Sequence, residues 1–228
     1  MALYYLSILY GALLTVGVSL AALAVSVLLG LLGAGAKLSG SRLLVALATG
    51  YTTVIRGIPE LVLMLLVFYG GSIGINHLLE LSGTGATLDI NPFTAGVLTL
   101  GFIYGAYMTE TFRGAILSIP RGQLEAAAAF GMGPVKTFLR ITAPQMVRHA
   151  LPGFTNNWLV LIKATALVSL IGLQEMTYLA KQASAATRSP FAFFLFTGAL
   201  FLIYTWVSLT VLRKLHDRYS LGAKRTQL

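Results

Sequence analysis

The sequence predicts an all-α integral membrane protein with about five transmembrane helices. Of its 228 residues, 57% are apolar and only 10% are charged, whereas about a quarter of the residues of a soluble domain are charged. The mean hydropathy is +0.82. The apolar residues gather in runs of about 20, the length with which a helix crosses a bilayer. No run alternates as a barrel strand would, so we expect helices throughout.

Five apolar runs are long enough to span a membrane. They cover residues 6–33, 61–79, 92–112, 151–173 and 191–212. An odd number of spans places the termini on opposite sides of the membrane. Of the 16 lysine and arginine residues, all but Lys163, Lys181 and Arg188 fall in segments on the side of the C-terminus. Because cytoplasmic segments carry the excess of basic residues, we expect a periplasmic N-terminus, a cytoplasmic C-terminus and one transmembrane domain over residues 1–228.

This topology explains the net charge of +9 and argues against a nucleic-acid partner, since the basic residues form no patch. The chain has no cysteine, which excludes disulfides and thiolate chemistry. Its histidines, His77, His149 and His216, show no metal-ligand spacing. We therefore expect no catalytic residue and no metal site in this chain.

The first run has no basic residue before it and its first charge, Lys37, comes after it, so we expect it to remain in the membrane rather than to act as a cleaved signal peptide. Residues 41–55 are mildly amphipathic and predict a short helix at the membrane interface. Gly57 and Pro59 should break this helix before the second span begins. Residues 80–92 read as a short outer loop.

The third run contains Gly101 and Gly105, a small-x-x-x-small pattern that allows close helix packing. We expect this packing to lie within the chain.

Residues 113–148 form the longest segment between spans, expected on the cytoplasmic side, and they look ordered. Pro120 stands at a helix start, strong helix formers follow, and Gly131 suits a left-handed helix cap. Gly133 and Pro134 then begin a second helix. In it Val135, Phe138 and Leu139 share one face, while Lys136 and Arg140 share another. Such a segment suits either the membrane surface or a protein partner.

The spacing in this segment favours the partner, because it resembles the conserved cytoplasmic loop of ABC importer permeases. That loop reads Glu-Ala-Ala, three residues, Gly, nine residues, Ile, one residue, Leu-Pro. Here the matching residues are Glu125, Ala126, Ala127, Gly131, Ile141 and Pro144, with Ala143 where the family favours leucine. In the family this loop, here about residues 120–144, is the coupling helix that docks on an ATPase subunit.

The resemblance extends over essentially the whole chain. The runs GYTTVIRGIPELVLMLLVFYG, GFIYGAYMTETFRGAI and ALPGFTNNWLVLIKATALVSLIGL resemble the polar amino acid branch of these permeases, above all the histidine/lysine/arginine/ornithine importers and the related octopine and nopaline importers. The resemblance implies the type I importer permease fold, a bacterial inner-membrane location and transport by alternating access.

The resemblance also implies partners and a division of labour. The partners are two copies of an ATPase, a second permease that is similar or identical, a periplasmic amino acid-binding protein and membrane lipid. The chain itself carries no phosphate-binding loop, so the resemblance implies that ATP and magnesium are bound on the ATPase and that this chain is no enzyme.

Ionisable and polar groups inside the spans are the candidates for the substrate pathway, since such groups are costly in lipid. A cationic amino acid needs a carboxylate for its side chain, which Glu60 or Glu110 would supply. Its own carboxylate needs donors, for which the candidates are Asn157, Thr165, Ser169 and Lys163. At about 100° per residue, Asn157, Thr165 and Ser169 share one face of the fourth span and Lys163 lies nearly opposite.

Structural roles stay open for the same residues. Glu60 is four residues from Arg56 and Glu110 is three from Arg113, so both acids could be paired at the inner membrane boundary. An ion-gradient-driven transporter or channel is the alternative function, although no inverted repeat of the kind typical of such folds is visible. A non-transporting scaffold would have no use for charges in its spans.

Overall fold

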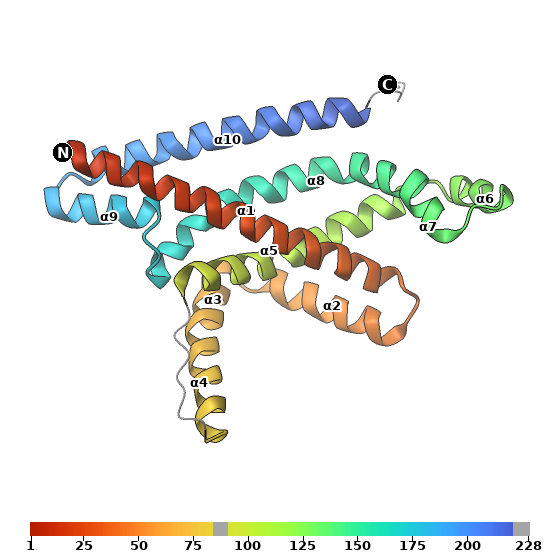
Figure 1. Cartoon of the computed structure of the whole chain (residues 1–228), viewed down its shortest axis with the longest axis horizontal. Coiled ribbons are helices and arrows are strands. Elements are labelled where there is room, and N and C mark those ends of the chain that lie inside the picture. The colour runs from red at the N-terminus through yellow and green to blue at the C-terminus, as the bar shows by residue number, and fades with distance from the viewer. Residues whose placement is uncertain (84–90, 221–228) are drawn as a thin grey trace.

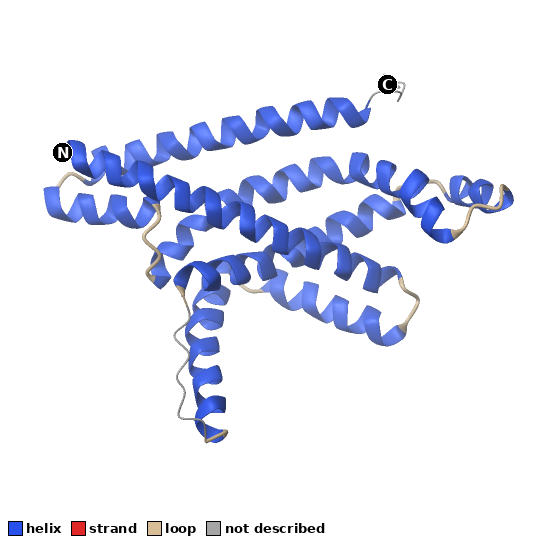
Figure 2. Ribbon diagram, viewed as in Figure 1, coloured by secondary structure: helices blue, strands red, loops and turns tan. Residues whose placement is uncertain are grey.

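The computed structural model describes residues 1–83 and 91–220, and every regular element in this part of the chain is a helix (Figures 1 and 2). The elements are α1 (Ala2–Leu38), α2 (Arg42–Gly57), α3 (Glu60–Leu65), η1 (Leu66–Gly70), α4 (Gly71–Leu81), α5 (Pro92–Leu117), α6 (Arg121–Ala129), α7 (Pro134–Thr137), η2 (Phe138–Thr142), α8 (Ala143–Ala164), η3 (Thr165–Ile171), α9 (Met176–Thr187) and α10 (Pro190–Ser220). The predicted all-α class is confirmed.

The long helices α1, α5, α8 and α10 run along the long axis of the molecule (Figure 1). Helix α5 lies at the centre, packed against α1, α2 and α8, and about half of its residues are buried. Its residues Leu100, Ile103 and Tyr104 join Trp158 and Leu161 of α8 in the largest core cluster. The core is therefore built around the third predicted span.

Within residues 1–83 and 91–220, four helical segments are long and apolar enough to cross a membrane. They are Ala2–Leu38, Glu60–Leu81, Pro134–Ile171 and Pro190–Tyr219. Three of them contain a predicted span, and Pro134–Ile171 covers the span predicted at 151–173 except for its last two residues. The third predicted span, residues 92–112, lies inside α5, which is long enough but less apolar. Because neighbouring helices cover much of α5, it has less need of apolar side chains, and the number of five spans stays a prediction.

Glycines allow α1 and α5 to approach closely, as the sequence predicted. A Cβ at Gly101 would lie 2.5 Å from Val25 of α1, and a Cβ at Gly105 would lie 2.8 Å from Leu29. From the other side, a Cβ at Gly30 would lie 2.5 Å from Met108. The expected packing within the chain is confirmed, and α1 contributes glycines of its own to it.

The segment after α1 differs from the expectation. Residues 41–55 were expected to lie at the membrane interface, but α2 lies lengthwise beside α1 and α5, with Ala48, Thr52 and Ile55 buried (Figure 1). The break at Gly57–Pro59 is confirmed, since Ile58 is extended and α3 begins at Glu60.

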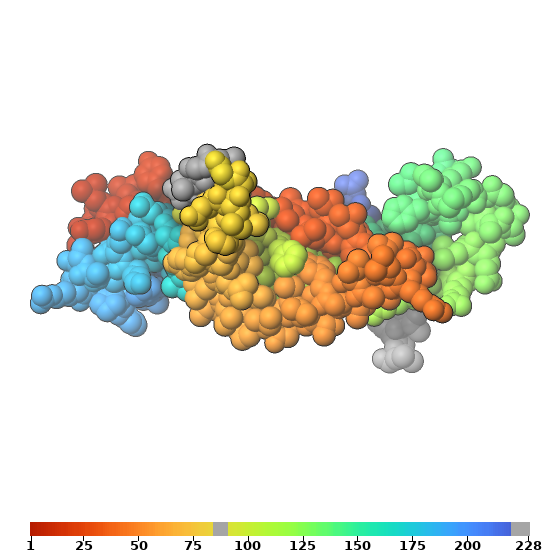
Figure 3. Space-filling model, turned by 90° about the horizontal axis from the view of Figure 1, so that it is seen from below, coloured from red at the N-terminus to blue at the C-terminus, as the bar shows by residue number. Residues whose placement is uncertain are grey.

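After this break, α3, η1 and α4 cross the direction of the bundle (Figure 1). Seen from below, α2 and α3 form much of the surface and α4 projects from it (Figure 3).

The predicted outer loop of residues 80–92 lies largely outside the described residues, as do Lys224 and Arg225 of the basic C-terminal segment. The fourth predicted span is longer than expected at its start, because α8 begins at Ala143. Its last part is not α-helical: η3 is a 3-10 helix that ends before Gly172, which has φ of 89°. Helix α9, which was not predicted from the sequence, packs against α1 and α10.

Candidate functional site

The helix pair expected to be the coupling loop, which comprises α6, α7 and η2, projects from one end of the molecule (Figure 1). Helix α6 ends in the predicted left-handed cap: Gly131 has φ of 69°. The amide of Met132 donates to the carbonyl of Ala127 at 3.0 Å, and that of Gly131 donates to Ala128 at 2.9 Å. These bonds satisfy the last carbonyls of the helix. Gly131 therefore reverses the chain between the two parts of the pair.

The two alanines of the motif differ in how exposed they are. Ala126 and Glu125 are exposed, whereas Ala127 is only 3% exposed. Ala126 and Ala127 line a shallow groove with Ile141 and Pro144. Small residues in α6 thus let the pair close on itself, and only part of the motif is available to a partner.

The outer surface of the helix pair is apolar. Phe130 is 88% exposed, and the three residues expected to share a face, Val135, Phe138 and Leu139, are exposed as well. The pair is joined to α8 by a hydrogen bond in which Gln145 Nε2 donates to Gln123 Oε1 at 2.5 Å. An ordered apolar surface with Lys136 and Arg140 exposed near it is suited to a protein partner.

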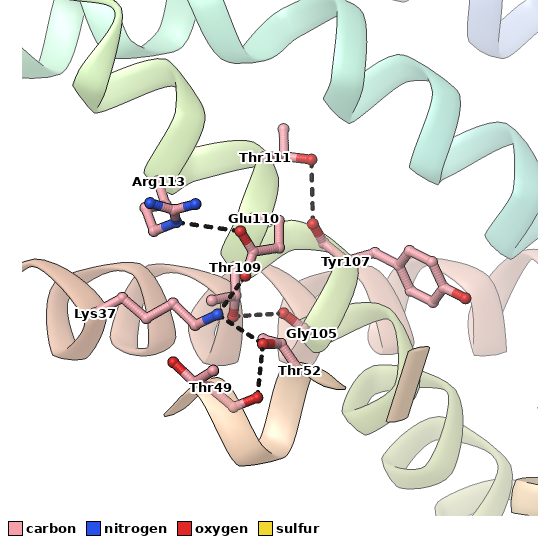
Figure 4. Close-up of polar contacts among 9 residues, drawn as sticks. All are labelled: Lys37, Thr49, Thr52, Gly105, Tyr107, Thr109, Glu110, Thr111 and Arg113. Carbon is pink, nitrogen blue, oxygen red and sulfur yellow. Dashed lines mark hydrogen bonds and ion pairs between the residues drawn. The ribbon is translucent and has the colours of Figure 1, made fainter. Parts of the chain in front are cut away.

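Glu110 of α5 is the centre of the Glu110 network, which consists of Lys37, Thr52, Glu110 and Arg113. Arg113 Nε donates to Glu110 at 3.1 Å, so the pairing weighed from the sequence is confirmed. Figure 4 shows Lys37 reaching from α1 to Glu110 and to Thr52 of α2. Lys37 Nζ donates to Thr52 Oγ1 at 2.7 Å. The network joins three helices, and Lys37 could not be predicted as a partner because it lies 73 residues from Glu110 in the sequence.

Glu60 has a different environment. The hydroxyl of Tyr104 donates to both carboxylate oxygens of Glu60, at 3.0 and 3.1 Å. The weighed pairing of Glu60 with Arg56 is not observed. Instead the guanidinium carbon of Arg56 lies 5.4 Å from the ring centre of Tyr107. The rings of Tyr104 and Tyr107 are 5.7 Å apart. We call Arg56, Tyr107, Tyr104 and Glu60 the tyrosine ladder.

The candidates on the fourth span do not form a continuous face. Asn157 is buried and its amide donates to Thr111 of α5 at 3.0 Å. Thr165 and Ser169 lie in η3, where they bond the backbone carbonyls of Ile162 and Ala166. The expected shared face assumed an α-helix throughout, whereas the 3-10 turns change the spacing. Lys163 is exposed.

Glu175, an ionisable group that follows the fourth predicted span, is a buried carboxylate. Glu175 precedes α9, is 1% exposed, and accepts hydrogen bonds from the amides of Thr177 and Tyr178 at 2.9 Å. Thr15 of α1 donates to it at 3.2 Å. Burial raises the pKa of Glu175, against the lowering effect of these hydrogen bonds. It caps α9 and ties that helix to α1.

Comparison with known proteins agrees with this architecture. Residues 26–220 match the family model described as "Binding-protein-dependent transport system inner membrane component". The chain is 50% identical to the histidine/lysine/arginine/ornithine transport system permease protein HisQ of Escherichia coli, over 97% of this chain and 96% of that protein. It is 41% identical to the octopine transport system permease protein OccQ of Rhizobium radiobacter, over 93% and 90%.

A solved structure also matches over nearly the full length. It is described as the crystal structure of an amino acid ABC transporter with histidines, and it matches with a TM-score of 0.80 and 30% identity over 96% of both chains. A chain of the methionine transporter MetNI matches with a TM-score of 0.67 at 16% identity, which supports the fold alone. The predicted resemblance to importer permeases is confirmed, and the comparisons give no support to an ion-driven transporter. The chain belongs to the family of binding-protein-dependent transport system inner membrane components and is a multi-pass ABC importer permease, the non-catalytic membrane subunit of a system whose ATPase is a separate chain.

Proposed function

We propose that this permease takes up basic amino acids, delivered by a periplasmic binding protein. The family implies an ATPase and a binding protein as partners. Beyond that, we propose two copies of the ATPase, which would bind ATP and magnesium, and a second permease that is similar or identical to this chain. All 228 residues would then act as one permease domain.

The observation that carries the proposal is the helix pair at the end of the bundle. An exposed apolar surface is costly unless a partner covers it, and Phe130, Val135 and Leu139 form such a surface on an ordered element. The pair continues into α8 without a loop, since α7, η2 and α8 follow one another directly. Movement imposed on the pair would therefore be transmitted along α8 into the centre of the bundle, which is what alternating access requires.

The substrate class is supported by two independent facts. The similar proteins are named as permeases for histidine, lysine, arginine and ornithine, for octopine and for arginine. In this chain, Glu60 is a half-buried carboxylate whose described partner is a neutral hydroxyl. A carboxylate that is not neutralised suits a cationic side chain. Glu110 is already paired with two cations, so we assign it a structural role.

Copurification and uptake test the proposal together. The permease would be expressed with its ATPase, second permease and binding protein, and the complex reconstituted in liposomes. We expect ATP-dependent uptake of arginine or histidine. Glu125→Arg should reduce recovery of the ATPase with the permease, because Glu125 is exposed on the helix pair. Glu80→Arg, a change of the same charge at an exposed site after the second predicted span, is the matched control.

Two results would contradict the proposal. One is uptake by liposomes that contain this chain alone and are driven by an ion gradient. The other is a complete complex that transports neutral or acidic amino acids and no basic ones.

A further inference from the structure

The tyrosine ladder places opposite charges at the two ends of an aromatic pair. Arg56 and Glu60 flank the break between α2 and α3, and each contacts a tyrosine of α5. Tyr104 and Tyr107 are three residues apart on that helix, so their rings lie about one turn apart on one face. The arrangement combines four side chains from three helices at one point of the fold.

The two charges are not balanced by each other. In the part of the chain that the structure describes, no ion pair joins Arg56 or Glu60 to any group. A spacing of four residues would pair them in a continuous helix, but extended Ile58 and Pro59 interrupt the helix between them. Unpaired charges are costly in a membrane protein and mark functional sites by default.

The ladder is accessible from outside the chain. Arg56 and Tyr107 line an open polar hollow together with Thr53, Gly57, Lys37 and Glu110. Arg56 is exposed and Glu60 is half-buried. Tyr104, in contrast, is 1% exposed, so its ring is fixed by packing and its hydroxyl has a defined direction. Both charged groups are therefore at least partly exposed, while the buried ring of Tyr104 stays in place.

We propose that the tyrosine ladder is a binding site for a zwitterionic amino acid with a cationic side chain. Arg56 binds the α-carboxylate, for which the planar guanidinium offers two parallel donors. Glu60 binds the cationic end of the side chain. The ring of Tyr107 holds Arg56 by a cation–π contact. Tyr104 is a positioning residue, which orients the carboxylate of Glu60 through its hydroxyl. This inference rests on the proposed function and adds to it a location and a residue for each end of the substrate.

Equilibrium binding of arginine to the complete transporter tests the site, without the binding protein so that only membrane sites are measured. Two analogues probe the two ends separately. Citrulline keeps the shape of arginine but has an uncharged side chain, and agmatine is arginine without its α-carboxylate. We expect the wild-type complex in lipid nanodiscs to bind arginine more tightly than either analogue.

Substitutions at the two ends of the site should weaken the binding of different ligands. Glu60→Gln should weaken arginine binding about tenfold or more and leave citrulline binding unchanged. Arg56→Gln should weaken arginine binding to a similar degree and leave agmatine binding unchanged. Tyr104→Phe should weaken arginine and agmatine alike but spare citrulline, a selectivity that general loosening of the fold would not produce. Tyr10→Phe makes the same change at a 68% exposed tyrosine of α1 outside the ladder and is the matched control, with no change expected.

Gel filtration of each complex verifies assembly. Glu60→Asp and Arg56→Lys, which keep the charges, replace any variant that fails to assemble. Each should retain the preference for arginine over the analogue that lacks the matching charge.

The inference is overturned if the wild-type complex shows no saturable arginine binding, or if the preferences are unchanged in assembled variants. If arginine uptake with the binding protein persists in that case, the proposed function stands and the site alone is wrong. A wild-type complex that takes up no basic amino acid would refute both.

Discussion

Glu60 and Glu110 have the same chemistry and opposite surroundings. Glu110 is held by Lys37 and Arg113, whereas Glu60 accepts hydrogen bonds from the neutral hydroxyl of Tyr104. From the sequence alone the two carboxylates look alike, because each has an arginine three or four residues away. Neighbours in the sequence cannot reveal that a helix break separates one pair, nor that a lysine from α1 joins the other.

Removing the charge of Glu110 should destabilise the protein. Glu110→Gln leaves Lys37, whose side chain is 10% exposed, and Arg113 without their counter-charge, and stranding a largely buried charge is costly. We expect a loss of about 1–3 kcal/mol, reduced from the fully buried case because Glu110 is partly exposed. Thermal unfolding of the detergent-solubilised complex would measure it. The double variant Glu110→Gln with Lys37→Met should recover part of the loss, and a single variant as stable as the wild type would contradict this role.

Glu175 predicts a pH dependence of stability. Burial raises the pKa of Glu175 above its usual value of 4.5, so the folded state binds this proton more tightly than the unfolded state does. The stability that protonated Glu175 contributes is full below the unfolded pKa and is lost as the pH rises through the raised folded pKa. The melting temperature should therefore fall over that range. Glu175→Gln, which is neutral at every pH, should flatten this part of the profile, and an unchanged profile would show that Glu175 does not cause it.

Among the elements, the seam between α1 and α5 depends on the absence of side chains. A Cβ at Gly33 would lie less than 3.0 Å from the side chain of Thr109, whereas a Cβ at Gly35, two residues further on, would meet nothing within 4 Å. We expect Gly33→Ala to cost about 1–3 kcal/mol through overpacking. Gly35→Ala should be neutral or slightly stabilising, since alanine favours the helix. Comparing the melting temperatures of the two variants tests the seam, and equal effects would argue against it.

The helix pair depends on one backbone conformation. Gly131 has φ of 69° with open space around it, so a larger residue would cause strain rather than a clash. Gly131→Val should cost about 1–2 kcal/mol locally and reorient α6 against η2. We expect ATPase copurification and uptake to fall while the melting temperature of the bundle changes little. Gly122→Ala, also in open space and without a positive φ, should leave both unchanged.

The sequence predicted those elements whose cause is local. The breaks at Gly57–Pro59 and Gly131–Pro134 follow from the backbone preferences of glycine and proline, and the close packing at Gly101 and Gly105 follows from their spacing. The direction of α2 and the 3-10 turns of η3 depend on which helices lie beside them, so periodicity alone could not give them. Tyr104 and Tyr107 were missed because tyrosines in an apolar run look like ordinary core residues.

At the scale of the whole molecule, the chain looks like part of an assembly. Its exposed large side chains include many apolar residues on the long helices, and α3, η1 and α4 together are only sparsely buried. Lipid can cover apolar side chains, but it is a poor neighbour for the exposed Lys163 of α8. A second permease packed against the bundle would account for both observations, in line with the proposed pair.

The central claim is that an ATPase drives the bundle through the helix pair, and site-directed crosslinking tests it most directly. Because the chain has no cysteine, Phe130→Cys introduces a single reactive thiol on the pair, and Lys181→Cys places one on α9, near the opposite end of the molecule (Figure 1). In the reconstituted complex we predict that the first crosslinks to the ATPase, in a yield that changes between the nucleotide-free and ATP-bound states, and that the second does not. Reaction of Phe130→Cys with lipid-soluble reagents alone, and with no ATPase in any nucleotide state, would contradict the account.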